Sequence, residues 1–292
     1  MQLLLRKIVT RPHRIAAILS SSKALQELSR HPHPTAQAIG AACYRALIGE
    51  VAPEERAAIA RIEALRTRAA ASQELLQVED FGAVSPTANL TQEQMYAGRT
   101  VQRTVGESSR AASKRPVWTA LLYQLVRAFA AKRCVELGCC VGVSAAYQTT
   151  AMQAAGPGGH LWTLEGAKAL AEVSQRHFKQ LGLDGQIDVV VGRFQDTLES
   201  LLQAQGPIDY AFIDGHHDEQ ATLRYLEQIL PHCQPRAMLV FDDIDWSEGM
   251  KRAWQAIWAD PRLPMAIDCG EIGVVVLDST LAERIRVRAP LW

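Results

Sequence analysis

From Lys132 onwards, the chain shows a regular alternation of short apolar runs and longer amphipathic segments. Short apolar runs bounded by turn residues predict buried strands, and segments with apolar residues at helical spacing predict helices. Alternation of this kind is typical of a mostly parallel sheet covered by helices on both faces. We therefore expect a doubly wound, seven-stranded α/β fold. The expected strands are 133–137, 160–164, 187–191, 208–213, 238–241, 265–268 and 273–277, and the expected helices are 143–155, 167–181, 219–230 and 248–259.

The first 110 residues follow a different pattern and lack strand-like alternation. They are rich in alanine, and apolar residues such as Ile59, Ile62 and Leu65 recur at helical spacing. We therefore expect a helical N-terminal extension over residues 1–110, followed by the α/β domain over residues 111–292. Within the extension, residues 80–91 are dense in turn formers and predict a loop.

Composition and charge are those of an ordinary globular protein. Hydrophobic residues make up 48% of the 292 residues and charged residues 21%, which argues against a disordered or low-complexity chain. The 31 Lys and Arg residues balance 31 Asp and Glu residues, so a nucleic-acid partner is not expected for the chain as a whole. The longest apolar stretch, residues 117–131, is too short to span a bilayer and predicts a packed helix, so no membrane span is expected.

The N-terminus and the cysteines bear on location. The first 34 residues carry six Lys or Arg residues and one acid, Glu27. A basic helical arm and an organelle transit peptide share this bias, and a basic arm could also dock on nucleic acid or an anionic membrane. The six cysteines form no CxxC pair, so neither a disulfide framework nor a zinc site is expected. A reducing cytoplasm is therefore the expected compartment.

A turn of small residues follows the first expected strand of the α/β domain. The segment from Glu136 to Ser144 contains Gly138, Cys140 and Gly142. Glycines let a ligand approach the backbone closely, and the following helix offers free N–H groups at its N-terminus. The glycines are four residues apart, so the dinucleotide pattern GxGxxG is absent. Tight packing between strand and helix is the alternative explanation for this turn.

Glu165 ends the second expected strand of the domain. A carboxylate at this place can accept two hydrogen bonds from a ribose diol. An acid that is stabilised by the dipole of the next helix would look the same in the sequence. Because the two strand ends are expected to be neighbours, the turn at residues 136–144 and Glu165 together favour a nucleoside site.

Aspartates follow two later strands. Asp214 ends one strand, and the pair Asp242 and Asp243 ends the next. In a parallel sheet these ends open on the same edge, so the three carboxylates are expected to converge, and they would repel one another unless a cation lies between them. Oxygen ligands of this kind suit Mg²⁺, or Mn²⁺ and Ca²⁺. Helix capping and exposure to water are the alternative roles for these aspartates.

His217 lies three residues after Asp214 and could remove a proton from a substrate hydroxyl near neutral pH. His216 is adjacent and weakens this signal, because one of the two histidines is expected to point elsewhere. A surface or capping histidine is the alternative. Trp246, at the end of the next strand, is a candidate wall of the substrate pocket.

Residues from about 112 to 278 resemble a class I S-adenosylmethionine-dependent methyltransferase. The turn at residues 136–142 is similar to the first motif of that family, which holds the methionine part and the ribose, and Glu165 is similar to its acidic residue after the second strand. Arg193 and Phe194 fall where the family often lines the adenine. The resemblance thus implies a cofactor site made by Glu136, Gly138, Cys140, Gly142, Ser144, Glu165, Arg193, Phe194 and Asp214.

Within this class, residues 212–217 and 241–243 resemble the catechol-type and macrolide-sugar-type O-methyltransferases. This branch commonly holds a divalent metal with one acid after the fourth strand and a pair after the fifth, and a Lys or His just beyond the first acid often serves as the base. The resemblance therefore implies a metal site at Asp214, Asp242 and Asp243, and His217 as the base. Residues 80–83 and 108–125 are also similar to a bacterial group of uncharacterised methyltransferases.

Two positions depart from the family pattern. Cys140 replaces the middle glycine of the first motif, and the metal pair is Asp242–Asp243 where catechol-type enzymes have Asp–Asn. We expect an O-methyltransferase that acts on a hydroxyl of a small molecule, with a vicinal diol or catechol-like acceptor, because a metal would chelate two oxygens. The N-terminal helices would cap the cleft or build a homodimer. An N-methyltransferase without a metal, and a binding partner that has lost catalysis, are the alternatives.

Overall fold

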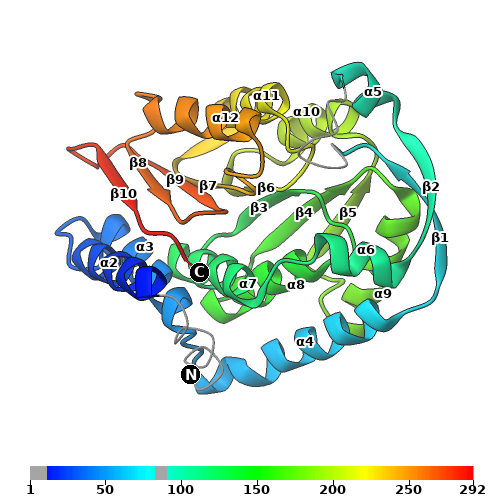
Figure 1. The fold of residues 1–292 in the computed structure, drawn as a ribbon, viewed down its shortest axis with the longest axis horizontal. Coiled ribbons are helices and arrows are strands. Elements are labelled where there is room, and N and C mark those ends of the chain that lie inside the picture. The colour runs from blue at the N-terminus through cyan, green and yellow to red at the C-terminus, as the bar shows by residue number, and fades with distance from the viewer. Residues whose placement is uncertain (1–11, 83–90, 292) are drawn as a thin grey trace.

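A computed structural model describes residues 12–82 and 91–291. An eight-stranded sheet forms its centre, in the order β10-β8-β9-β7-β6-β3-β4-β5 (Figure 1). β9 is antiparallel to both of its neighbours, and the other neighbouring pairs are parallel. The strands are β3 (Arg133–Leu137), β4 (His160–Glu165), β5 (Ile187–Val191), β6 (Ile208–Ile213), β7 (Cys233–Phe241), β8 (Met265–Asp268), β9 (Gly273–Asp278) and β10 (Ile285–Arg288).

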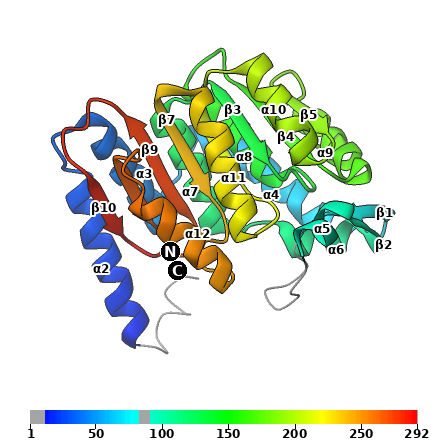
Figure 2. The ribbon, with the colours of Figure 1, turned by 90° about the horizontal axis from the view of Figure 1, so that it is seen from above.

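Helices cover both faces of this sheet, which confirms the expected fold class. Successive side chains of a strand point to opposite faces, so Cys134 of β3 joins one hydrophobic core and Val135 joins the other. Figure 1 shows the sheet between an upper and a lower layer of helices, and Figure 2 looks down on the sheet through the upper layer. One face carries α7 (Pro116–Phe129), α8 (Val143–Ala155) and α9 (Lys168–Leu181), and the other carries α10 (Phe194–Gln205), α11 (Glu219–Ile229) and α12 (Glu248–Ala259).

The sheet has one strand more than expected. β10 pairs in parallel with β8 at the edge, where Ile285 lies opposite Met265. The segment after Asp278 was not expected to form a strand, although residues 285–288 alternate between apolar and charged side chains as a half-buried strand does. The remaining strands match their expected ranges closely, although β7 begins five residues before the expected 238. A short 3₁₀ turn, η2 (Leu230–His232), leads into it.

The N-terminal region is not purely helical, so that expectation was wrong in part. It contains α2 (Pro12–Leu28), α3 (Pro34–Ile48), the 3₁₀ turn η1 (Pro53–Glu55), α4 (Arg56–Ala71), α5 (Gln92–Ala97) and α6 (Val105–Ala112). It also contains an antiparallel ribbon of β1 (Leu75–Asp80) and β2 (Arg99–Thr104). Most ribbon side chains are exposed or half-buried, so no apolar alternation marks it in the sequence. Residues 83–90 of the expected loop lie outside the described residues.

The N-terminal helices share one core with the α/β domain. Leu25 of α2 and Ile39 of α3 are fully buried in the same apolar cluster as Trp118 and Leu121 of α7. Ser21 Oγ donates a hydrogen bond to the carbonyl of Pro290, and the buried Thr35 hydroxyl donates to Asp278. Helices α2 and α3 therefore close the β10 edge of the sheet, and it is the β1–β2 ribbon and α6 that reach the cavity described below.

Candidate active site

A cavity opens at the carboxyl ends of β3, β4 and β6, where ligands of doubly wound folds bind. The β1–β2 ribbon, α6 and the segment leading into α7 form its opposite wall. The cavity is lined by residues 78–82, Arg103, Ser108, 111–114, 138–141, Val143, Ser144, 165–167, Leu170, Arg193, Phe194 and 214–217.

The turn between β3 and α8 adopts backbone conformations that explain its small residues. Gly138 has φ +100°, and a Cβ atom built on it would lie 1.9 Å from the carbonyl oxygen of Asp214. Gly142 has φ +84° as the N-cap of α8, and a Cβ there would meet the ring of Phe178 at 2.6 Å. Both glycines are therefore needed for packing. Gly138 and Cys140 line the cavity, and Gly142 does not.

Glu136 does not reach the cavity. Its carboxylate is fully buried beneath the turn and accepts hydrogen bonds from Gln148 Nε2 at 2.7 Å and Thr163 Oγ1 at 2.6 Å. Burial raises the pKa of Glu136 to about 7, although the hydrogen bonds favour the charged form and act to lower this pKa. Its side chain thus joins β3, β4 and α8 instead of lining the expected cofactor site.

Glu165 lies at the cavity wall, as expected for a residue that binds a diol. Its two oxygens accept backbone hydrogen bonds from Cys140 N at 2.7 Å and Ala167 N at 2.9 Å. These bonds fix the carboxylate, and burial raises its pKa above the usual value. Each carboxylate oxygen has a second lone pair, so both could still accept a hydroxyl hydrogen from the cavity side.

Ser144, Arg193 and Phe194 also line the cavity. Arg193 is already engaged, because its Nε pairs with Asp196 at 2.6 Å and its Nη1 donates to the carbonyl of Tyr96. The Phe194 ring meets the His216 ring edge-on, with centroids 5.4 Å apart. The structure therefore brings these expected cofactor residues to one wall of the cavity.

The acidic cluster, Asp214, Asp242 and Asp243, does converge, and a lysine lies among its carboxylates. Lys114 Nζ is 3.7 Å from Asp214 Oδ1 and 3.8 Å from Asp243 Oδ1, and it donates a hydrogen bond to Asp242. The Asp242 side chain is almost completely buried, and neither Asp242 nor Asp243 lines the cavity. The cation that the sequence led us to expect between the carboxylates is, in this structure, the Lys114 ammonium.

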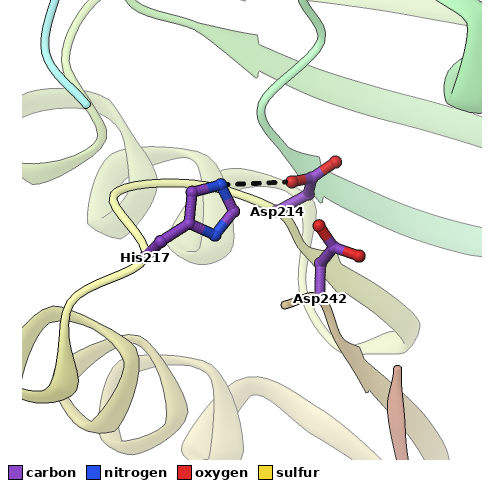
Figure 3. A group of neighbouring side chains, drawn as sticks. All are labelled: Asp214, His217 and Asp242. Atoms are coloured by element: carbon purple, nitrogen blue, oxygen red, sulfur yellow. Dashed lines mark ion pairs between the residues drawn. The ribbon is translucent and has the colours of Figure 1, made fainter. Parts of the chain in front are cut away.

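His217 lines the cavity. Its imidazole lies beside Asp214 and Asp242 of the acidic cluster (Figure 3). Its Nε2 is 3.7 Å from Asp214 Oδ1, and its Nδ1 is 3.6 Å from Asp243 Oδ2. The Trp246 ring lies against the imidazole, with centroids 5.5 Å apart. Ligand atoms of Asp214, His217 and Asp242 all lie within 4.8 Å of one another, which is close enough for one metal ion.

Burial and charge oppose one another in this cluster. Burial and the charge of Asp214 raise the pKa of Asp242 to about 7, although Lys114 acts against this shift. Burial favours a neutral Lys114, but the three carboxylates outweigh it and raise its pKa, so the ammonium stays charged. Burial lowers the pKa of His217, while Asp243 and Asp242 act to raise it. A neutral His217 at pH 7 could accept a proton.

His216 has a different environment from His217. It is buried among the rings of Tyr96, Phe194 and Tyr225, and its Nδ1 shares a hydrogen bond with the Tyr225 hydroxyl. Burial lowers the pKa of His216 to about 4, so it is neutral. This agrees with the expectation that only one of the two histidines faces the acidic cluster.

Backbone strain is concentrated at this site. Five non-glycine residues among those described have a positive φ. Four of them belong to the turn or to the acidic cluster and its neighbours: Cys140 (47°), His216 (63°), His217 (48°) and Asp243 (53°). Such conformations cost roughly 1–3 kcal/mol each and persist where the surrounding structure fixes them, which is common at functional sites.

Lys114 is the main residue that the sequence analysis missed. It lies between α6 and α7, 100 residues before Asp214, in the segment Ser113–Pro116 that carries no recognisable motif. The ribbon residues were missed for a similar reason: Asp80 pairs with both Arg99 and Arg103 at the cavity wall. Only the resemblance of residues 80–83 and 108–125 to other methyltransferases pointed to this wall.

The comparisons with known proteins agree with this geometry. Residues 135–244 match the family model described as "Methyltransferase domain". This range runs from β3 through the acidic cluster.

Two curated relatives carry the name catechol O-methyltransferase. One, from Mycobacterium tuberculosis, is 32% identical over 120 residues, which are 41% of this chain and 51% of that protein. The other, from Niastella koreensis, is 31% identical over 125 residues, which are 42% of this chain and 53% of that protein. The chain thus spans about half the length of these relatives.

A solved structure supports the fold. A protein of Klebsiella pneumoniae that is provisionally named an O-methyltransferase matches with a TM-score of 0.50 and 23% identity, over 58% of this chain and 83% of that one. None of the helices in the described part of this chain is long and apolar enough to cross a membrane. The family match, the relatives and the sheet order together confirm the resemblance of this chain to the class I S-adenosylmethionine-dependent methyltransferases.

Proposed function

We propose that this protein is an S-adenosylmethionine-dependent O-methyltransferase that methylates a hydroxyl of a small molecule. The observation that carries the proposal is the cavity at the ends of β3, β4 and β6. Glu165 and His217 both line this cavity, and His217 lies beside the acidic cluster. The names of the curated relatives support the reaction class.

The residues of one cavity wall fit the methyl donor. S-adenosylmethionine would supply a methyl group that its sulfonium already activates, so the protein has mainly to align donor and acceptor. Glu165 would accept hydrogen bonds from the ribose diol, because backbone N–H groups fix its carboxylate at the cavity. Gly138 and Cys140 would border the methionine part, and Phe194 and Arg193 the adenine. Asp214 is the member of the acidic cluster that also lines the cavity, so it would contact the cofactor.

His217 would act as the general base. It lines the cavity, its pKa is lowered by burial, and the carboxylates of Asp214 and Asp243 lie within 3.7 Å of its two ring nitrogens. Those carboxylates would orient the ring and stabilise the imidazolium after proton transfer. The Trp246 ring packs against the His217 imidazole, and it would border the acceptor.

The acidic cluster fits a divalent cation by the chemistry of its donors. Carboxylates are ligands that Mg²⁺ or Mn²⁺ accepts, and oxygens of Asp214, Asp242 and Asp243 surround one small space, because each lies within 4 Å of Lys114 Nζ. A divalent cation bound there would supply Lewis acidity that favours loss of the acceptor's hydroxyl proton. Chelation by such an ion would favour a vicinal diol or a catechol-like acceptor.

We place the reaction in the cytoplasm. The six cysteines are free thiols, and four of them are buried, as is ordinary in a reducing compartment.

Calorimetric titration with S-adenosylmethionine and S-adenosylhomocysteine, with and without Mg²⁺, tests the proposal. We expect micromolar binding, loss of affinity in Glu165→Gln, and no change in the exposed control Glu172→Gln. A panel of catechols, diols and amines, assayed with radiolabelled donor, then identifies the acceptor class. No binding of either nucleoside would refute the proposal, and methylation of amines alone would replace it by N-methylation.

A further inference from the structure

Lys114 occupies the centre of the acidic cluster. Its ammonium is within 4 Å of a carboxylate oxygen of Asp214, Asp242 and Asp243, and its side chain is 14% exposed. Among the described residues, these carboxylates form ion pairs with Lys114 and His217 alone. Lys114 is therefore the fixed positive charge that offsets three nearby negative charges.

This position is also the one that a divalent cation needs. A metal ion held by Asp214, Asp242 and Asp243 has to lie among the carboxylate oxygens that surround Lys114 Nζ within 4 Å. Mg²⁺ binds oxygen at about 2.0–2.1 Å, so it would lie in the same small space as the ammonium. Two positive charges at such a distance repel one another strongly in a buried site. One occupant has to leave before the other binds.

Lys114 has room to leave. It lies in the short connection between Ala112 and Pro116, outside both flanking helices, and it lines the cavity. Its flexible four-carbon stem can therefore turn the ammonium from the carboxylates towards the cavity without a change in the helices.

We propose that the Lys114 ammonium and a divalent cation are alternative occupants of the acidic cluster, and that Lys114 is a positioning residue that sets the metal affinity of the site. The inference rests on the proposed function, whose acceptor site it concerns. Lys114 keeps the three carboxylates together before the metal binds. When the metal binds, the ammonium moves into the cavity.

Calorimetric titration of the full chain with Mn²⁺ and with Mg²⁺ provides the first test. Lys114→Met keeps the apolar stem and removes the competing charge, so we expect its metal affinity to rise about a hundredfold over that of the unmodified protein. Arg115→Ala is the matched control, because Arg115 is the next residue and pairs with Glu271 instead of the cluster. It removes the same charge nearby, and we expect a change of less than about threefold.

Amine labelling of the unmodified protein provides a second test that needs no variant. Acetylation of Lys114, measured by mass spectrometry against the exposed Lys179, should be slow without metal and become several-fold faster with saturating Mn²⁺. A rise in affinity in Lys114→Met together with faster labelling supports the inference. Equal affinity in Lys114→Met and the unmodified protein, no metal binding in either, or Lys114 labelling that Mn²⁺ leaves unchanged would overturn it.

Binding of S-adenosylmethionine, measured on the same samples, separates the two proposals. If the nucleoside binds but metal affinity does not depend on Lys114, the inference fails and the proposed function stands. If the metal competes with Lys114 but no nucleoside binds, the proposed function fails and the cation site stands.

Discussion

The buried carboxyl group of Glu136 makes a quantitative prediction about stability and pH. Glu136 is fully buried, and its pKa is raised from 4.5 to about 7 in the folded protein. The folded state therefore holds this proton more tightly than the unfolded state does, so the contribution to stability is largest at low pH and falls as the pH rises through 7. Across this shift of 2.5 pH units, the charged form destabilises the fold by about 3 kcal/mol.

Glu136→Gln removes the titrating group and keeps the side-chain length. Thr163 can still donate to the amide oxygen, and the Gln148 amide can turn to accept from the new NH₂ group. The free energy of unfolding of the variant, minus that of the original chain, should rise by roughly 2–3 kcal/mol between pH 5 and pH 8. Other titrating groups are common to both proteins, so their contributions cancel in this difference.

Urea unfolding at several pH values measures this difference. Glu172→Gln, which changes an exposed glutamate on α9, is the control and should give a difference that is flat with pH. If the Glu136→Gln difference is also flat with pH, the pKa of Glu136 is the same in the folded and unfolded protein. The conclusion that burial raises this pKa would then be wrong.

Three further predictions concern the turn, the base and the N-terminal helices. Gly138→Ala should destabilise the protein by at least about 2 kcal/mol in urea unfolding, because its Cβ would overlap the Asp214 carbonyl; Gly185→Ala, in open space, should be near neutral. His217→Ala should lower kcat roughly 10²–10⁴-fold with little change in S-adenosylmethionine affinity, and equal kcat would exclude it as the base. Leu25→Ala should cost about 2–5 kcal/mol and the exposed Leu19→Ala almost nothing; equal losses would contradict the shared core.

Much of the α/β domain could be predicted from local pattern. Strands such as Arg133–Leu137 and Ile208–Ile213 are buried on both faces, so they are short apolar runs with clear ends. The carboxylates of the acidic cluster could be expected to meet, because parallel strands bring their carboxyl ends to one edge. The parallel arrangement of β6 and β7 is therefore enough to explain why Asp214 lies close to Asp242 and Asp243.

The parts that could not be predicted depend on tertiary contacts. The β1–β2 ribbon is mostly exposed, and its residues pair through backbone hydrogen bonds and through Asp80 with two arginines, which leave no periodic pattern. Lys114 reaches the aspartates only because α7 packs against the sheet and places its N-terminal connection at the cavity. Glu136 looked like a ligand residue, but the pleat of β3 turns its side chain under the turn and towards Gln148.

The contacts that close the β10 edge bear on how the chain folds during synthesis. The Ser21 hydroxyl of α2 finds its hydrogen-bond partner only at Pro290, 269 residues later, and the buried Thr35 hydroxyl finds its partner at Asp278, 243 residues later. Helix α2 packs first on α3, and α3 packs on α7, but the part of α2 that faces β10 stays uncovered until the ribosome has made that strand. Contacts so distant in sequence form late and leave the nascent chain open to aggregation. Chaperone binding to α2 while the rest of the chain is still being synthesised is the expected cost of this arrangement.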